Sequence, residues 1–279
     1  MANYTTADIK ALREQTGAGM MDVKKALDEA DGNLEKAVEI IRVKGLKGIA
    51  KREGRATSAG LIAAEVLDTA EGQVGVLVET NAETDFVVKN EKFIDFSAKV
   101  LAAAVASGAE TVEALAQVEV DGETVQSLTD GMQAVIGEKI VVSRVARLAA
   151  PKVDLYLHRT NPDLPAQVAV LVGTDEKAAE VAHDVAMHIA AYSPQYLTRD
   201  EVPAEVVEKE RAIAEETTRA EGKPEQAIAR IVEGRLGGFF KEICLTEQAY
   251  AKDPKTTVGK VVAATGGEVT GFVRVRVGA

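Results

Sequence analysis

The chain has 279 residues, a length that favours roughly two domains and leaves room for more than one modest core. Hydrophobic residues make up 46% and charged residues 28%, which is ordinary for a globular protein and argues against wholesale disorder. The net charge of −11 repels phosphate backbones and disfavours nucleic acid as the main partner, and no apolar run approaches the ~18–20 residues that cross a bilayer.

Residues 1–45 are predicted to form three short helices. The first carries Ile9 and Leu12 on one face, the second stops at an Asp-Gly pair, and the third ends at Gly45. A glycine-containing turn at residues 16–21 separates the first two. The few large apolar groups leave only a marginal core, which favours a docking module over an enzyme.

Residues 46–58 are predicted to form a basic linker. The segment has little apolar content and contains two glycines and four basic residues: Lys47, Lys51, Arg52 and Arg55. Such a cluster can contact nucleic acid, but in so acidic a chain we interpret it as a solvated tether.

Residues 59–150 form the first half of a predicted core. Two β-rich runs, residues 61–68 and 73–80, are joined by a short turn that indicates a hairpin. An apolar helix follows over residues 93–108, ended by a glycine, and then a second helix over residues 124–136. A further strand reaches residue 150, just before a proline.

Residues 151–279 repeat this pattern. The segment "GQVGVLVETN" at residues 72–81 matches "AQVAVLVGTD" at residues 166–175 at six of ten positions. Each segment follows another short strand and precedes an Ala-rich helix, so we expect a duplicated core. The strands align with an offset of 94 residues and the helices with an offset of 85, so the second copy is about nine residues shorter between strand and helix.

The residues missing from the second copy are those around "TDFVVKNEK". Phe86, one of only six phenylalanines, lies there in a polar loop beside Glu83 and Asp85. One interpretation is that the ring packs against the local core before the next helix. The other is that the added loop presents the ring to something outside the chain, which is favoured because Phe86 has no counterpart in the second copy.

The second half contains an insertion of its own. Residues 200–240 are predicted to form an antiparallel helical hairpin, inserted at about residues 203–236 and reversing at residues 221–224. Each arm has about 16–18 residues, so it projects on the order of 25 Å. The apolar seam is predicted to consist of Val206, Ile213, Ile228, Ile231 and Leu236. A final helix and an alternating strand return to the core.

Residues for catalysis or metal binding are not grouped in the sequence. His183 and His188 are five apart, unlike an i,i+4 zinc pair, and His188 lies in an apolar helix where a core or interface role is favoured. Cys244 is the only cysteine, so no intrachain disulfide can form and a reducing, cytoplasmic setting is expected. No phosphate-loop or dinucleotide motif occurs. We predict no cofactor, no metal and no bond chemistry.

Two long segments carry a family resemblance. They are "LREQTGAGMMDVKKALDEADGNLEKAVEIIRVKG" at residues 12–45 and "ETNAETDFVVKNEKF" at residues 79–93, and both resemble signature segments of bacterial elongation factor Ts. Later segments resemble that family in order, among them "AMHIAAYSPQYL" and "TVGKVVAATGGEVTGFVRV". The likeness covers nearly the whole chain.

The resemblance implies a guanine-nucleotide exchange factor for elongation factor Tu, the GTPase that delivers aminoacyl-tRNA. It implies an α+β fold in which a UBA-like three-helix module precedes a duplicated core with antiparallel sheets and the helical hairpin. Thr84, Asp85, Phe86 and Val87 would form the loop that inserts near the Mg²⁺ and phosphate site of elongation factor Tu. Further implied partner contacts are Leu12, Met20, Met21 and His188.

The resemblance also implies an assembly. Some members continue past the last strand into a further helical module that touches elongation factor Tu, and that contact is expected to be absent here. Other members have one core copy and work as dimers, whereas the internal repeat favours a monomer that binds one elongation factor Tu, without membrane or direct nucleic-acid contact. Two other hypotheses stay open: an adaptor of the ubiquitin-associated type, and a small-molecule enzyme with a polar pocket between the core halves.

Overall fold

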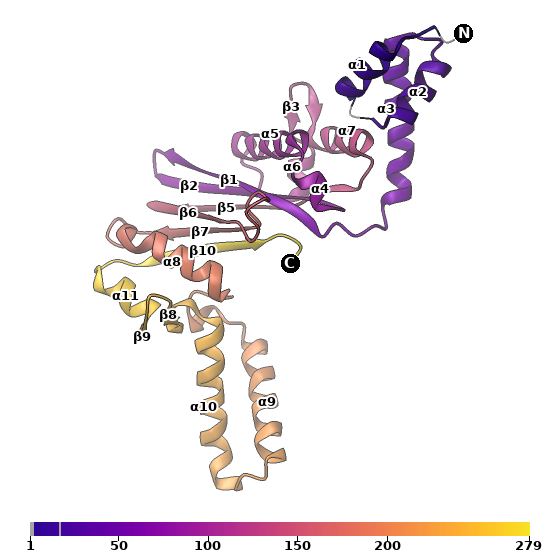
Figure 1. Ribbon diagram of the computed structural model, residues 1–279. Helices are drawn as coiled ribbons and strands as arrows, with labels where there is room; N and C mark the ends of the chain where they lie inside the picture. The colour runs from indigo at the N-terminus through magenta and orange to yellow at the C-terminus, as the bar shows by residue number, and fades with distance from the viewer. Residues whose placement is uncertain (1–2, 17) are drawn as a thin grey trace.

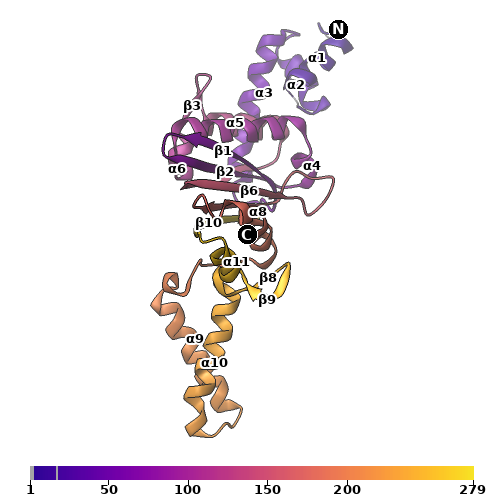
Figure 2. The same cartoon turned by 90° about the vertical axis from the view of Figure 1, so that its left-hand side faces the viewer.

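The computed structural model describes residues 3–16 and 18–279. It has the predicted α+β architecture: three N-terminal helices, a two-part core of antiparallel sheets with helices, and a helical arm (Figure 1). The N-terminal module and the arm lie at opposite ends of the molecule, with the core between them (Figures 1 and 2). Within the described ranges, no helix is both long and apolar enough to span a membrane.

The N-terminal module consists of three helices: α1 (Thr6–Thr16), α2 (Met20–Glu29) and α3 (Leu34–Ile49). Their inward faces share one apolar cluster: Leu12, Ala18, Val23, Ala26, Leu27, Ala30, Ala37 and Ile41. Asp31 and Gly32 follow α2 with φ values of 50° and 83°, and this left-handed backbone explains the predicted stop at an Asp-Gly pair. Gly17, in the predicted turn, lies outside the described residues.

The predicted end of the third helix at Gly45 is wrong. Helix α3 continues to Ile49 and is followed by the 3₁₀ turn η1 (Ala50–Arg52), so the first part of the predicted linker is helical. A Cβ atom at Gly45 would lie only 2.4 Å from the Cβ atom of Ala134 in α7 (Val125–Ile136). The glycine therefore permits a close crossing of two helices instead of ending one.

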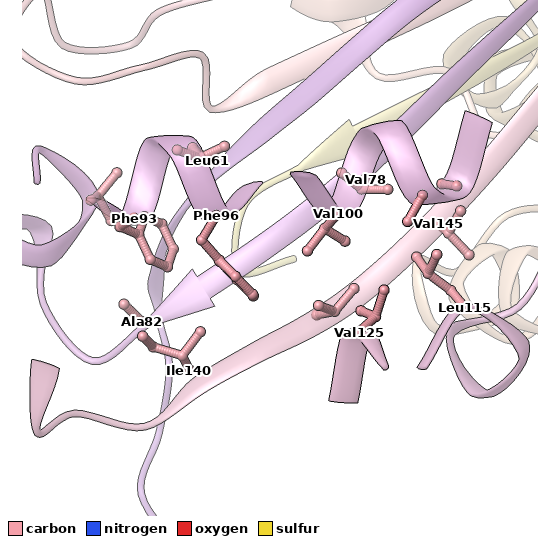
Figure 3. Packing of buried hydrophobic residues seen from close by; sticks show 14 of the residues in the cluster. Leu61, Val78, Ala82, Phe93, Phe96, Val100, Leu115, Val125, Ile140 and Val145 are labelled. Carbon is pink, nitrogen blue, oxygen red and sulfur yellow. The ribbon is translucent and has the colours of Figure 1, made fainter. Parts of the chain in front are cut away.

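The first half of the core is built on a three-stranded antiparallel sheet in the order β1-β2-β5. Its strands are β1 (Ala59–Thr69), β2 (Gly72–Ala82) and β5 (Ile140–Ala150). Besides α7, the elements packed beside it are α4 (Asp85–Val88), α5 (Glu91–Ser107), α6 (Val112–Ala116) and the small hairpin of β3 (Glu119–Val120) and β4 (Glu123–Thr124). Figure 3 shows the core beneath α5, where its apolar side chains lie over those of β2 and β5.

The second half has the same topology, with sheet order β10-β7-β6 and antiparallel pairing throughout. Its strands are β6 (Lys152–His158), β7 (Val168–Thr174) and β10 (Val269–Arg276). Helices α8 (Ala179–Tyr192) and α11 (Val258–Ala264) pack on it, and the shorter elements are η2 (Arg199–Glu201), η3 (Leu245–Glu247), β8 (Ala249–Tyr250) and β9 (Asp253–Thr257). In both halves the central strand pairs with the strands before and after it, which confirms the predicted duplication.

The repeated positions have the same roles in both halves. Leu77 and Leu171 both belong to the apolar cluster between the two sheets, whereas Val76 and Val170 both belong to clusters with the covering helices. Because each central strand is buried on both faces, it reads as a continuous apolar run and not as an alternating one. The molecule is therefore layered as helices, sheet, sheet and helices (Figure 1).

The arm consists of α9 (Ala204–Ala220) and α10 (Glu225–Ile243), with the predicted reversal between them. Its seam differs from the prediction: Ile213 is 48% exposed, and the neighbouring Ala214 is buried in its place with Ile228, Val232 and Leu236. Three ion pairs also join the two helices: Arg211–Glu233, Arg219–Glu225 and Arg235–Glu221.

Candidate partner-binding site

The added loop forms a single projecting turn of helix. Strand β2 ends at Ala82, Thr84 occupies the N-cap position, and α4 contains only four residues. Val87 and Val88 are buried in the core of the first half, whereas Phe86 is 82% exposed. The interpretation that Phe86 packs against its own core is therefore wrong, and the ring is presented to the outside.

Asp85 and Phe86 share the exposed side of this turn. The apolar support lies on the other side, where Phe93 and Phe96 of α5 are buried with their ring centroids 6.2 Å apart (Figure 3). The loop thus has a buried apolar base and an apex that carries one carboxylate and one ring.

Polar contacts hold the first residues of the loop. The N–H of Thr84 donates to Oε2 of Glu138 at 3.0 Å, and its hydroxyl donates to Oε1 of the same side chain at 2.8 Å. In return, Oε1 of Glu83 accepts the N–H of Lys139 at 2.7 Å, and both carboxylate oxygens accept from Nη1 of Arg55 at 3.1 Å. Two turns far apart in the sequence are thereby joined.

The charge of Glu83 is stabilised in this position. Burial acts to raise its pKa, but the N–H of Lys139 and the guanidinium of Arg55 outweigh that effect and hold the pKa below its ordinary value. Arg55 therefore contacts the core, as does Arg52, whose Nη1 donates to the carbonyl of Gln133 at 3.2 Å. This part of the predicted solvated tether is bound to the protein.

Sequence reasoning did not find Glu138 and Lys139. They lie 54 and 56 positions from their partners Thr84 and Glu83, at the turn between α7 and β5. No local pattern marks such a pair, and only the antiparallel pairing of β2 with β5 brings the two turns together.

The predicted contacts of the N-terminal module are divided between surface and interior. Met20 and Met21 begin α2 and are 58% and 63% exposed, so both can meet a partner. Leu12 is fully buried in the module's own core, where it holds α1 in place and offers no surface.

His188 is also an interior residue. It is buried in α8, its Nε2 lies 2.9 Å from Oε1 of Gln248, and its Nδ1 accepts the N–H of Ala251 at 3.2 Å. Burial lowers its pKa, against the opposing effect of the Gln248 hydrogen bond, so the neutral imidazole with hydrogen on Nε2 suits both contacts. The half-exposed Tyr192 stacks on it with ring centroids 4.6 Å apart, so any partner would meet Tyr192 first.

Two observations bear on the enzyme hypothesis. In the part of the chain that the structure describes, no group of three His, Cys, Asp or Glu side chains could hold a metal ion. Apolar side chains fill the space between the two sheets, where the enzyme hypothesis requires a polar pocket. What the described site offers is an exposed ring on a supported turn.

Comparisons with known proteins assign the family. A family model described as "Elongation factor TS" matches residues 83–279, more than half of the chain. The chain is 63% identical to elongation factor Ts of Beutenbergia cavernae, 62% identical to that of Micrococcus luteus and 60% identical to that of Renibacterium salmoninarum, and each alignment covers 100% of both chains. This chain belongs to the elongation factor Ts family. The Phe86 loop and its support by Glu83 and Glu138 lie within the range matched by the elongation factor Ts model.

Proposed function

We propose that this chain accelerates GDP release from elongation factor Tu by inserting the turn of residues 84–87 beside the Mg²⁺ and phosphate site of that GTPase. As a member of the elongation factor Ts family, the chain is a nucleotide-exchange factor for elongation factor Tu in translation elongation, and not an enzyme. We further propose that the insertion takes place in the cytoplasm, in a complex of one chain with one elongation factor Tu.

The observation that carries the proposal is the exposure of Phe86. A ring left 82% exposed loses contact with water only when a partner covers it. Burial of a phenylalanine removes ~150–250 Å² of surface, which contributes roughly 2–3 kcal/mol. Because the buried valines and the bonds to Thr84 already hold the turn, little conformational entropy is lost when the ring inserts.

The chemistry of the nucleotide explains why such an insertion releases it. Mg²⁺ bridges phosphate oxygens and neutralises their charge, so displacement of the ion greatly weakens the binding of the nucleotide. Asp85 adds a carboxylate to the same turn. Linkage requires the effect to be reciprocal, so GDP must weaken the binding of the exchange factor as much as the factor weakens that of GDP.

The remaining contacts are assigned by exposure. Met20 and Met21 supply surface for docking of the N-terminal module, whereas Leu12 and His188 act from the interior, by keeping α1 and Tyr192 in place. Both core halves reside in one chain, which favours a single copy in the complex.

Replacement of Phe86 by alanine tests the proposal. Phe86→Ala is expected to lower the stimulated release of fluorescent GDP from elongation factor Tu about 30-fold, as ~2 kcal/mol of lost contact predicts. Its thermal unfolding midpoint should stay at the wild-type value because the ring is exposed in the free protein. The matched control is Leu157→Ala, another exposed apolar side chain, in the second half; it should leave release unchanged. Wild-type release rates with Phe86→Ala would exclude insertion of the ring as the cause of GDP release.

A further inference from the structure

Two turns face each other at the base of the Phe86 loop. One runs from the end of β2 into α4 and contains Glu83 and Thr84; the other runs from α7 into β5 and contains Glu138 and Lys139. Glu138 receives two hydrogen bonds, from the N–H and the hydroxyl of Thr84, at 3.0 and 2.8 Å. Its carboxylate therefore holds both the backbone and the side chain of the N-cap residue of α4.

The Thr84 hydroxyl is used in an unusual way for its position. At an N-cap, a threonine oxygen normally accepts an N–H from the first turn of its own helix. The Thr84 side chain makes no such bond and donates outward to Glu138 instead. By contrast, Thr111, Thr124 and Thr257 accept the expected N–H at the starts of α6, α7 and α11.

A helix of four residues cannot maintain its own conformation in water, because nucleation is costly and so few hydrogen bonds repay it. The orientation of Phe86 must therefore be set by the attachments on either side. Val87 and Val88 supply the attachment after Phe86 by burial, and Thr84, bound to Glu138, supplies the one before it.

The second half shows what the fold alone requires at this junction. There Asp175 follows β7, and its Oδ1 accepts the N–H of Ala178 at 2.9 Å and that of Glu268 at 3.2 Å. A carboxylate after the central strand, bound to the turn before the last strand, is thus common to both halves, with Glu83 in this role in the first. The second contact, from the opposite turn back to the loop, is found among the described residues only in the first half, where Glu138 makes it. The corresponding position in the second half is Gly267, where a side chain would not fit because its Cβ atom would lie 2.3 Å from Oδ1 of Asp175.

We propose that Glu138 is a positioning residue for nucleotide exchange: by holding Thr84 it orients the one-turn helix so that Phe86 points outward for insertion. This inference rests on the proposed function, and it adds a residue outside the loop to the exchange mechanism. Glu138 acts through Phe86 and needs no contact with elongation factor Tu.

The first test is the rate of stimulated GDP release with Glu138→Ala at a saturating concentration of the factor. Because Glu138 acts only through the ring, the effect of its loss cannot exceed the ~30-fold loss of Phe86→Ala, and we expect a reduction of about tenfold. Glu138→Gln keeps one acceptor oxygen at the same place and should recover most of the rate. If Glu138 had only a structural role, the release rate would fall only where the thermal unfolding midpoint also falls. We expect Glu138→Ala to release GDP more slowly than Glu138→Gln although both keep the wild-type midpoint.

The decisive test is a double-mutant cycle with Phe86→Ala. If Glu138 acts through Phe86, then Glu138→Ala should cause no further loss when the ring is already absent, because coupled residues are non-additive. Reductions that multiply would show an independent role and overturn the inference. If Phe86→Ala has a strong effect and Glu138→Ala has none, only the positioning role of Glu138 is overturned. If Phe86→Ala has no effect, the proposed insertion of the ring is rejected, and the role of Glu138 is rejected with it.

Hydrogen exchange in the free protein tests the orientation without the partner. Glu138→Ala should accelerate exchange at the Thr84 amide and at residues 85–90, and leave the strands β2 and β5 protected. Asp175→Ala is the matched control for the release assay. It breaks the corresponding junction in the second half and should leave stimulated GDP release at the wild-type rate. Unchanged protection of residues 84–90 in Glu138→Ala would contradict the positioning role of Glu138.

Discussion

Cys244 lies directly after α10 with none of its surface exposed. Burial raises the pKa of its thiol to about 11 from an ordinary value of 9.0, with a smaller contribution from the nearby Glu247 carboxylate. The thiolate is the nucleophile that attacks a thiol reagent, so both access and ionisation disfavour reaction in the folded protein.

We therefore expect Cys244 to be labelled at pH 8 by a disulfide reagent about 100-fold more slowly in the folded protein than in urea, since two pKa units change the thiolate fraction by that factor. The folded pKa is the higher one, so the contribution of this group to stability is complete below pH 9 and is lost as pH rises from 9 towards 11. Rapid labelling of the folded chain would contradict the buried placement.

Phe86 and Glu138 show how far single residues can be predicted from the sequence. The exposure of Phe86 could be predicted because a scarce ring lies in a loop that the second copy lacks. Glu138 is one carboxylate among 44 acidic residues, and its partner Thr84 lies 54 positions away. His188 was correctly expected in an apolar setting, but its stacking with Tyr192 depends on packing that helical spacing alone does not specify.

At the scale of elements, the crossing of α3 over α7 joins the N-terminal module to the core. Besides the close approach at Gly45, Arg42 pairs with Glu123 at 3.7 Å, and Nζ of Lys92 donates to the carbonyl of Glu14 at 3.2 Å. Grooves of about 360 and 510 Å³ lie beside the crossing. The module and the Phe86 loop are therefore held in a defined relative position.

Replacement of Gly45 by alanine should disturb this crossing. Its Cβ atom would lie 2.4 Å from the Cβ and 2.8 Å from the Cα atom of Ala134, so the helices must separate, at a cost of about 1–3 kcal/mol in the free energy of unfolding. Stimulated GDP release should also fall if both the module and the loop contact elongation factor Tu as proposed, because their relative position would change. Urea unfolding and release kinetics measure the two effects.

Gly131→Ala is the matched control for this substitution. Gly131 lies in α7, where an added Cβ would meet nothing within 4 Å, so alanine should raise the free energy of unfolding by about 0.5–1 kcal/mol. The crossing has no special role if Gly45→Ala and Gly131→Ala stabilise the protein equally.

Elements with a strong local signal were predicted, and those decided by neighbours were not. The stop at Gly108, the reversal of the arm and the strand pairs follow from glycine, proline and apolar spacing. Gly45 is predicted to end a helix because the sequence does not reveal its neighbour Ala134 on α7. In the arm, Ile213 is predicted in the seam because it is the larger apolar residue, but the structure buries Ala214 there and leaves Ile213 exposed.

At the scale of the whole molecule, the two sheets form one apolar interior. Gly75 is central to it, because a Cβ atom there would lie 2.7 Å from Cδ2 of Leu171 and 3.0 Å from Cγ1 of Val153, both in the second half. The matched position in the other copy, Ala169, carries a methyl group that the packing accommodates. The two halves are thus expected to unfold together.

Gly75→Val should therefore lower the stability of both halves, by about 1–3 kcal/mol, through overpacking between the sheets. Far-UV circular dichroism and tyrosine fluorescence in urea check this, since four of the five tyrosines lie in the second half: Tyr156, Tyr192, Tyr196 and Tyr250. The two signals should shift to the same lower urea midpoint. A fluorescence midpoint that stays at the wild-type value would mean that the halves unfold independently.

The two halves share a sheet topology but differ at the junction after the central strand, and within the residues described only the first half presents an exposed ring there. Transplanting residues 83–90 into the turn after β7 would not be enough to hold a second exposed ring, since Gly267 occupies the position that corresponds to Glu138 and has no carboxylate to bind the loop. Under the proposed role of Glu138, an exchange loop in the second half would need both the loop residues and a carboxylate on the opposite turn.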